Sequence, residues 1–151
     1  MSRDSSEATP PPEESSVGSF VAGKVLVVDD EKHIARFLEF VLKKAGYTVL
    51  IEHFGGSVVD IVREERPQAL VLDLMLPDLS GYEVLERISE ANLRSNISIL
   101  VLTASPGEGA ANKALKESVD SLCLKPIAPS ALVSTLKDLG VYPPSERKNR
   151  G

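Results

Sequence analysis

The stretch Val-Leu-Val-Val-Asp-Asp-Glu, residues 25–31, joins a run of apolar residues directly to a run of acidic ones. Consecutive valine and leucine residues are typical of a strand that is buried on both faces. Large apolar side chains then recur at the spacing of one helix face, at Ile34, Phe37, Leu38, Val41 and Leu42. The segment therefore predicts a strand over residues 24–28, an acidic loop and an amphipathic helix.

The same alternation continues along the chain. Further strands are expected at residues 47–51, 69–72, 97–102 and 119–124. Helices are expected after them, with apolar positions around residues 58–62, 84–88, 110–117 and 132–139. Strands that are apolar at nearly every position and are joined by helical crossovers belong to parallel sheets covered on both faces. The sequence therefore predicts an α/β fold with five strand-helix units around a doubly wound parallel sheet.

The chain has 151 residues and a net charge of −5, which fits one globular domain. Residues 1–22 are rich in serine, contain Pro10-Pro11-Pro12 and carry more acidic than basic side chains, so we expect a disordered acidic leader. Residues 23–141 hold nearly all of the hydrophobic periodicity and form the predicted domain. Residues 142–151 are expected to be a short basic tail.

Composition excludes several classes of protein. Cys123 is the only cysteine, so no internal disulfide or cysteine-based zinc site can form, and we expect it to be a small buried residue. The acidic balance argues against direct binding of nucleic acid. No apolar run approaches the length of a membrane span, and residues 1–22 lack the apolar core of a signal peptide. We expect a cytoplasmic protein without membrane insertion.

Parallel α/β sheets bind their ligands at the carboxyl ends of the strands, so the residues that directly follow the strands are the candidates for chemistry. They are Asp29 and Asp30 after the first strand, Asp73 after the third, Thr103 after the fourth and Lys125 after the fifth. Singly, each has an ordinary explanation as a helix start, a turn, a cap or a surface lysine. Their joint placement at one sheet edge favours a functional site.

Clustered carboxylates need a counter-ion, because two of them about 4 Å apart repel by roughly 4 kcal/mol at an effective dielectric constant near 20. Oxygen ligands without imidazole or thiolate favour Mg²⁺, which commonly binds carboxylates together with phosphate oxygens. We therefore predict that Asp73 attacks a phosphoryl group to form an aspartyl phosphate. Its phosphoryl oxygens would be shared among Mg²⁺, the Thr103 hydroxyl and the Lys125 ammonium.

Four segments together resemble the receiver domain of bacterial two-component response regulators. They are residues 25–31, Leu-Asp-Leu-Met-Leu-Pro-Asp-Leu-Ser-Gly (72–81), Leu-Thr-Ala (102–104) and Leu-Lys-Pro (124–126). The resemblance covers residues 24–140 and implies a flavodoxin-like (βα)5 fold with strand order 2-1-3-4-5. It also implies a cis peptide bond between Lys125 and Pro126.

The same resemblance implies the ligands and the phosphoryl donor. Mg²⁺ would be held by Asp30, Asp73 and the backbone carbonyl of Met75, with Asp29 acting largely through water. A sensor histidine kinase or a histidine phosphotransfer protein would supply the phosphoryl group. The downstream partner would bind the surface of the fourth helix, fifth strand and fifth helix.

The sequence departs from the family pattern in three places. Leu122 stands where an aromatic residue commonly couples phosphorylation to the surface, and Ser118-Val119-Asp120 stands where Gly-Ala-Asp is frequent. Residues 110–117 contain few large apolar side chains, so we predict a mobile fourth helix. His33 and His53 have no carboxylate cluster of their own and are expected to be solvated, without a chemical role.

Only eleven residues follow Gly140, so we expect a stand-alone receiver that signals through contacts with other proteins and is no enzyme beyond its own phosphorylation and dephosphorylation. One alternative is a scaffold with the same fold that acts without phosphorylation. The other is a phosphatase of the haloacid-dehalogenase type. That class needs Asp-x-Asp after the first strand, where this chain has Asp29-Asp30-Glu31.

Overall fold

The computed structural model describes residues 20–107 and 109–146. Five strands form one parallel sheet in the order β2-β1-β3-β4-β5. The strands are β1 (Val21–Val28), β2 (Thr48–Glu52), β3 (Pro67–Leu72), β4 (Ser98–Thr103) and β5 (Ser121–Leu124). The helices are α1 (Lys32–Lys44), α2 (Val58–Glu65), α3 (Gly81–Glu90), α4 (Gly109–Ser118) and α5 (Pro129–Asp138). The predicted α/β fold and its strand order are confirmed.

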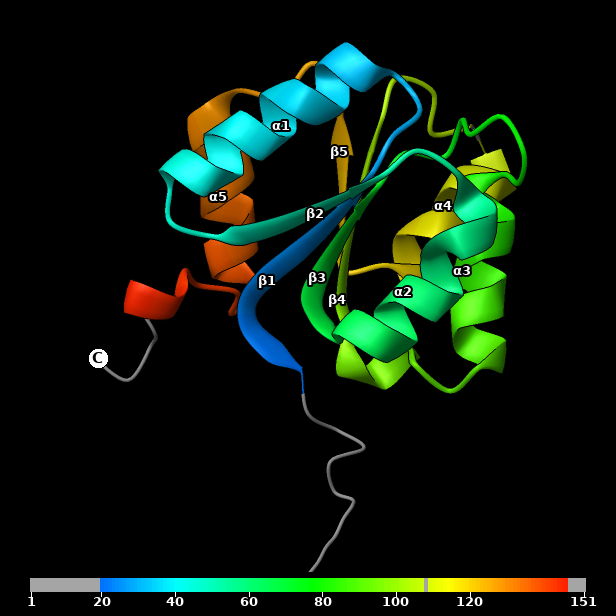
Figure 1. Ribbon diagram of the computed structural model, residues 1–151. Helices are drawn as coiled ribbons and strands as arrows, with labels where there is room; N and C mark the ends of the chain where they lie inside the picture. Colours follow the sequence, from blue (N-terminus) through cyan, green and yellow to red (C-terminus); the bar gives the residue numbers. More distant parts are fainter. Residues whose placement is uncertain (1–19, 108, 147–151) are drawn as a thin grey trace, which may run out of the picture.

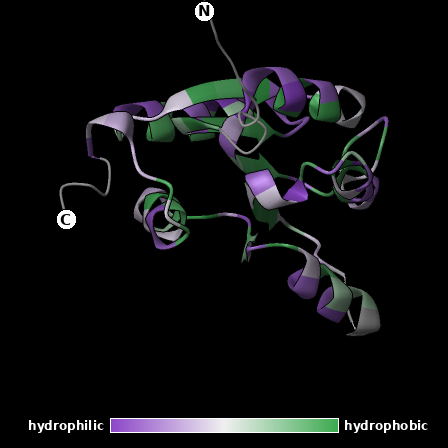
Figure 2. Cartoon of the chain, turned by 90° about the horizontal axis from the view of Figure 1, so that it is seen from below, coloured by the Kyte–Doolittle hydropathy of each residue, from purple (hydrophilic) through white to green (hydrophobic). Residues whose placement is uncertain are grey.

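The sheet separates two layers of helices, with α1 and α5 on one face and α2, α3 and α4 on the other (Figure 1). Each face has its own apolar core, because the side chains of a strand alternate between the two faces. The central strands are therefore buried on both sides, which explains why the sequence is apolar at nearly every position there. Figure 2 shows hydrophobic residues concentrated in the sheet and hydrophilic residues on the outer sides of the helices.

The first strand is longer than the sequence pattern indicates. β1 begins at Val21, whose amide donates to the carbonyl of Arg66, and Val21 pairs with Pro67 at the start of β3. β5 begins at Ser121, later than predicted, and the preceding Val119 packs into the core from the connecting loop. The ends of the predicted leader and tail therefore contain ordered structure, whereas residues 1–19 and 147–151 lie outside the described residues.

The last described residues of the chain pack against β1 and the loop after α1. The 3-10 turn η3 (Pro144–Glu146) places the Pro144 ring against Gly23, which has a positive φ of 72° and leaves no room for a Cβ atom. Lys137 pairs with Glu146 at 2.8 Å, and the buried Tyr47 hydroxyl donates to the carbonyl of Val141 at 2.7 Å. These contacts fix the amino-terminal edge of the sheet.

Arg94 anchors the end of α4, where Ser118-Val119-Asp120 contains no glycine. It lies in the 3-10 turn η2 (Arg94–Asn96), and its side chain donates to the carbonyl oxygens of Ser118 (3.3 Å) and Ile97 (3.0 Å). It also pairs with Asp120 at 3.2 Å, which in turn accepts the Ile99 amide at 2.7 Å. The helix end is thus held by one guanidinium group rather than by a glycine turn.

The rest of α4 is weakly held. Leu115 is the one side chain of this helix that is buried among those that the structure describes. This agrees with the few large apolar residues in the sequence, and the mobility of α4 remains a prediction. Cys123, expected to be a small buried residue, packs against the core but is only half-buried, because β5 is an edge strand. Within the described residues, no helix has the length and apolar character needed to cross a membrane.

Candidate functional site

An acidic cluster forms where two neighbouring strands end. Asp29 and Asp30 follow β1 and Asp73 follows β3, which lies beside β1. The sheet hydrogen bonding continues one residue further, since the Asp73 amide donates to the Val28 carbonyl at 3.0 Å and the Asp29 amide to the Glu52 carbonyl at 3.1 Å. Oxygens of the three aspartate carboxylates lie within 4.8 Å of one another. Such a cluster could hold a metal ion.

Burial makes this cluster unusual. The exposed fraction is 2% for Asp29 and 5% for Asp73, whereas Asp30 is more accessible. Burial raises the pKa of Asp29 above its ordinary value, although the hydrogen bond from Lys125 and that from the Glu31 amide oppose the rise. Buried carboxylates at this spacing require a cation nearby.

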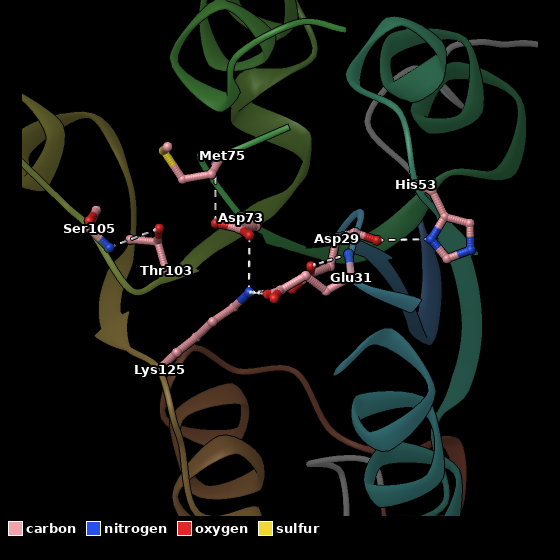
Figure 3. Close-up of polar contacts among 8 residues, drawn as sticks. All are labelled: Asp29, Glu31, His53, Asp73, Met75, Thr103, Ser105 and Lys125. Atoms are coloured by element: carbon pink, nitrogen blue, oxygen red, sulfur yellow. Dashed lines mark hydrogen bonds and ion pairs between the residues drawn. The ribbon is translucent and has the colours of Figure 1, made fainter. Parts of the chain in front are cut away.

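Lys125 supplies that cation in the structure (Figure 3). Its ammonium nitrogen lies 2.7 Å from Asp29 Oδ2, 3.0 Å from Asp73 Oδ2 and 3.1 Å from Glu31 Oε1. Burial alone would lower the pKa of Lys125, but the hydrogen bonds with these three carboxylates outweigh it and raise the pKa above its ordinary value. The lysine follows β5, and the predicted cis bond to Pro126 is present.

The other predicted residues lie at the same sheet edge. Thr103 is fully buried at the end of β4, and its hydroxyl oxygen accepts the Ser105 amide at 3.3 Å. The Met75 amide donates to Asp73 Oδ1 at 3.2 Å, while the Met75 side chain is exposed. Figure 3 shows Thr103 and Met75 near the Asp73 carboxylate, with Asp29 and Glu31 on its other side. The structure therefore gathers every residue that the sequence placed in the site.

Two further residues belong to the site and were missed. Glu31 is a third carboxylate partner of Lys125, and its amide donates to Asp29 Oδ1 at 2.9 Å. Nδ1 of His53, a residue expected to be solvated and without a chemical role, lies 2.9 Å from the Asp29 carbonyl oxygen and so contacts the backbone of the site. His53 follows directly after β2, so the rule that selected the ends of the other strands could have found it.

Comparison with known protein families identifies the family of this chain. A family model of the response regulator receiver domain matches residues 25–137. The chain belongs to the response regulator receiver domain family. The family predicted from four short segments is thus confirmed, and with it the classification as a response regulator in two-component signal transduction.

Solved structures agree with this assignment. The receiver domain is similar to the CheY-like response regulator receiver domain from Methanospirillum hungatei JF-1, with a TM-score of 0.70 and 25% identity over 87% of this chain and 100% of that chain. It is also similar to chemotaxis response regulator CheY4 of Vibrio cholerae, with a TM-score of 0.69 and 26% identity over 79% and 99% of the two chains. The receiver domain of Francisella response regulator 1452 gives a TM-score of 0.69 and 25% identity over 78% and 95%.

The loop of this receiver domain that carries Asp73 is clamped to the 3-10 turn that precedes α2. The two carboxylate oxygens of Asp78 accept the amides of Gly55 and Gly56, each at 2.9 Å. These two hydrogen bonds lower the pKa of Asp78 below its ordinary value. A Cβ atom on Gly55 would lie 2.7 Å from the Leu79 carbonyl oxygen, so glycine is required for this close approach. The sequence analysis did not detect the clamp.

Proposed function

We propose that this receiver domain accepts a phosphoryl group on Asp73 in a Mg²⁺-dependent reaction. The observation that supports the proposal best is the buried Asp73 carboxylate, which lies between the Lys125 ammonium and two further aspartates. In this proposal Asp73 is the nucleophile, Lys125 is the cation, and Asp29 and Asp30 are further oxygen ligands. No carboxylate cluster placed only for solubility needs to be buried in this way.

In this proposal the acidic residues of the site hold the metal ion. Asp29, Asp30 and Asp73, with the backbone carbonyl of Met75, would hold Mg²⁺, and Asp29 would act largely through water. The ion would neutralise charge on the phosphoryl oxygens. Hard oxygen donors without a nearby thiolate or metal-facing imidazole fit Mg²⁺ better than zinc.

The transfer step balances within the site. An oxygen of Asp73 forms a bond to phosphorus while the bond from phosphorus to the donor's imidazole nitrogen breaks, and the electron pair stays on that nitrogen, which takes up a proton. The Thr103 hydroxyl donates to one phosphoryl oxygen, and the Lys125 ammonium pairs with another. Hydrolysis of the acyl phosphate by water returns Asp73 to its starting state. The chain would be no enzyme beyond these reactions on itself.

The phosphoryl donor in this proposal is a sensor histidine kinase or a histidine phosphotransfer protein, and the protein acts in the cytoplasm. The downstream partner is a protein that binds the surface of α4, β5 and α5. An exposed fraction of 58% for Leu124 at the end of β5 supports this surface, because a large apolar side chain at a sheet edge favours a protein contact. Phosphorylation must favour one conformation of this surface in order to signal.

The test is intact mass spectrometry after incubation with acetyl phosphate, with Mg²⁺ or with EDTA. We expect the wild type to gain one phosphoryl group only with Mg²⁺, and Asp73→Ala to gain none. Asp60→Ala, which removes an exposed carboxylate from α2, is the matched control and should behave as the wild type does.

The scaffold alternative makes the opposite prediction. A folded wild-type chain that gains no phosphoryl group from acetyl phosphate, nor from a phosphorylated histidine phosphotransfer domain, would support a function without phosphorylation. Release of phosphate from an added phosphomonoester in many turnovers would instead support the phosphatase alternative.

A further inference from the structure

Tyr82 is the second residue of α3, and its side chain reaches the loop that follows β4. Its hydroxyl donates to the Pro106 carbonyl at 3.1 Å, and a Cβ atom on Gly107 would lie 3.2 Å from the same hydroxyl oxygen. The exposed fraction of Tyr82 is 42%. Because the ring is only partly covered, core packing alone does not account for this side chain, whereas its hydroxyl has a specific partner.

The start of α3 is fixed against the backbone of Asp73. The amide of Gly81, the residue before Tyr82, donates to the Leu74 carbonyl at 2.9 Å. A Cβ atom on Gly81 would lie 2.6 Å from the Cα atom of Leu74 and 2.8 Å from the Asp73 carbonyl oxygen. The first turn of α3 therefore holds Tyr82 at a set place relative to the proposed phosphoacceptor.

The Pro106 end of the hydrogen bond is tied to Thr103. The amide of Ser105, the residue before Pro106, donates to the Thr103 hydroxyl oxygen at 3.3 Å (Figure 3). Thr103 is the last residue of β4, and its carbonyl accepts the Lys125 amide at 3.0 Å. β4 lies beside β3, which Asp73 follows. The loop after β4 is therefore joined at one end to the hydroxyl of the site and at the other to α3.

The hydrogen bond between Tyr82 and Pro106 links the two loops of the site. One loop leads from Asp73 to α3, and the other leads from Thr103 to residue 107. In the part of the chain that the structure describes, this is the one hydrogen bond between α3 and residues 104–107. Its loss would leave the position of the second loop to the Ser105 amide and to the Asn112 side chain, which donates to the Gly107 carbonyl at 3.3 Å.

The position of this loop determines which way the Thr103 hydroxyl points. A hydroxyl group has one proton to donate, and its oxygen accepts hydrogen bonds from other donors. The Ser105 amide is such a donor, so the Thr103 proton must point elsewhere and is free for a phosphoryl oxygen on Asp73. A donor that is already oriented lowers the barrier more than one that must first reorient.

Leu122 of β5 cannot hold the loop in this way. It pairs with Val101 of β4 and packs, partly buried, against the apolar core on the side of α2, α3 and α4. Its side chain has no polar atom and therefore forms no hydrogen bond with residues 104–107. Tyr82 lies on the same side of the sheet and carries the hydroxyl group that Leu122 lacks.

We propose that Tyr82 is a positioning residue for phosphoryl transfer to Asp73. Its hydrogen bond to Pro106 fixes the Ser105 amide on Thr103, and so keeps the Thr103 proton directed to the phosphoryl group. This role rests on the phosphoacceptor function proposed above. Tyr82 does not touch the phosphoryl group or the metal ligands, so its hydroxyl affects the rate of transfer and leaves the affinity for Mg²⁺ unchanged.

The first test measures the rate of phosphorylation of the full chain by acetyl phosphate over a range of Mg²⁺ concentrations. In Tyr82→Phe we expect the maximal rate constant to fall about fivefold, the effect of one lost hydrogen bond, with an unchanged Mg²⁺ concentration at half-maximal rate. Tyr47→Phe is the matched control, because it removes a hydroxyl that donates to the Val141 carbonyl at 2.7 Å, at the opposite end of the sheet.

The control separates positioning from a loss of stability. Tyr47 is buried, so Tyr47→Phe should destabilise the fold at least as much as Tyr82→Phe and still be phosphorylated at the rate of the wild type. Equal rates in Tyr82→Phe and the wild type would overturn the proposal. A fall of the same size in both variants would overturn it as well, because lower stability would then explain the effect.

The second test asks whether Tyr82 acts through Thr103. Thr103→Val keeps the shape of the buried side chain and removes its hydroxyl. If Tyr82 orients that hydroxyl, Tyr82→Phe should cause no further slowing in a chain that already carries Thr103→Val. A double variant that is slowed by the full product of the two single effects would show that Tyr82 acts independently of Thr103, and would overturn the proposal.

The third test needs no phosphoryl group. The Ser105 amide resonance in the NMR spectrum should shift in Tyr82→Phe and stay in place in Tyr47→Phe. With a wild type that is phosphorylated, an unshifted Ser105 amide in Tyr82→Phe would overturn the role of Tyr82 alone. A wild type that gains no phosphoryl group would overturn the proposed function, and the role of Tyr82 in transfer with it.

Discussion

The ammonium nitrogen of Lys125 lies closer to Asp29, at 2.7 Å, than to Asp73, at 3.0 Å. The lysine therefore acts first as the counter-ion of the buried aspartate cluster, and only part of its hydrogen-bonding capacity is directed to the proposed phosphoacceptor. Binding of a divalent cation would replace Lys125 as the counter-ion of the aspartates, so that its ammonium group could pair with a phosphoryl oxygen. The ion pair with Asp29 is thus a resting arrangement that phosphorylation must exchange for another.

Replacing Lys125 with methionine tests this relationship. The variant leaves two buried carboxylates without their cation, so we expect the free energy of unfolding at pH 7 to fall by about 3 kcal/mol in EDTA. The raised pKa of Lys125 means that its contribution is complete below the ordinary value of 10.5 and is lost only as the pH rises through the higher value in the folded protein. Urea titration at several pH values measures both effects.

Mg²⁺ should then stabilise Lys125→Met more than it stabilises the wild type, because the ion replaces the lost positive charge. Lys24→Met is the matched control. Lys24 is a similarly buried lysine that pairs with Glu65 at 2.6 Å, remote from the acidic cluster. If Mg²⁺ stabilises the two variants equally, the positive charge of Lys125 does not substitute for that of the metal ion.

A second prediction concerns the end of α4. Arg94→Ala removes two hydrogen bonds to backbone carbonyls and the ion pair with Asp120, so we expect a loss of about 1 to 3 kcal/mol in the free energy of unfolding. Arg87→Ala, which removes an exposed ion pair with Glu83 at 3.7 Å, should cost less than about 0.5 kcal/mol. Equal losses in the two variants would show that Arg94 does not anchor the helix.

A third prediction follows from the carboxylate of Asp78. Because its pKa is lowered in the folded protein, its contribution to stability is present above the ordinary value of 3.8 and is lost as the pH falls through the lower folded value. Asp78→Asn should therefore have a lower Tm than the wild type at pH 7, and the difference should disappear in strong acid. Differential scanning calorimetry across pH measures this. A difference that is constant with pH would contradict the carboxylate clamp.

The same variant should bind Mg²⁺ more weakly, since the clamp holds the loop between Asp73 and Gly81. Asp60→Asn is the control, because Asp60 is exposed and its partner Arg63 lies 3.5 Å away on the same helix. Calorimetric titration of Mg²⁺ into both variants compares the two. Unchanged affinity in Asp78→Asn would show that the loop keeps its conformation without the clamp.

A fourth prediction concerns the mobility of α4. Its amides should exchange with solvent faster than those of α1, because Leu115 is its one buried side chain among those described. The Tyr82 hydroxyl donates to the Pro106 carbonyl at 3.1 Å and ties the loop before α4 to α3. Tyr82→Phe should accelerate exchange in α4 further without changing exchange in α1. Equal protection of the two helices in the wild type would refute the prediction.

The residues of the main site could be predicted from the sequence because the topology of the sheet alone brings them together. Asp29, Asp73 and Lys125 each follow a strand directly, Thr103 is the last residue of its strand, and the carboxyl ends of parallel strands meet at one edge. No knowledge of side-chain conformation is needed for that conclusion. The layers of the fold were predicted correctly for a related reason. Strands that are buried on both faces are apolar at nearly every position, whereas helices that are buried on one face are apolar at every third or fourth position.

Contacts between loops could not be predicted in this way. The clamp joins Asp78 to Gly55 and Gly56, which are more than twenty residues away and belong to no shared strand pair. Arg94 likewise reaches the end of α4 from a separate turn. Such contacts depend on how loops of particular lengths fold over the sheet edge, and the periodicity of apolar residues carries no information about them.

The packing of Pro144 against Gly23 brings the first strand and the last turn together at the end of the sheet remote from Asp73, about 17 Å along β1 from Gly23 to Val28. A short linker can therefore connect these two points without crossing the site. The domain is accordingly suited to circular permutation, with new ends opened in a surface loop, and to insertion as a cassette into a loop of a fluorescent or enzymatic reporter.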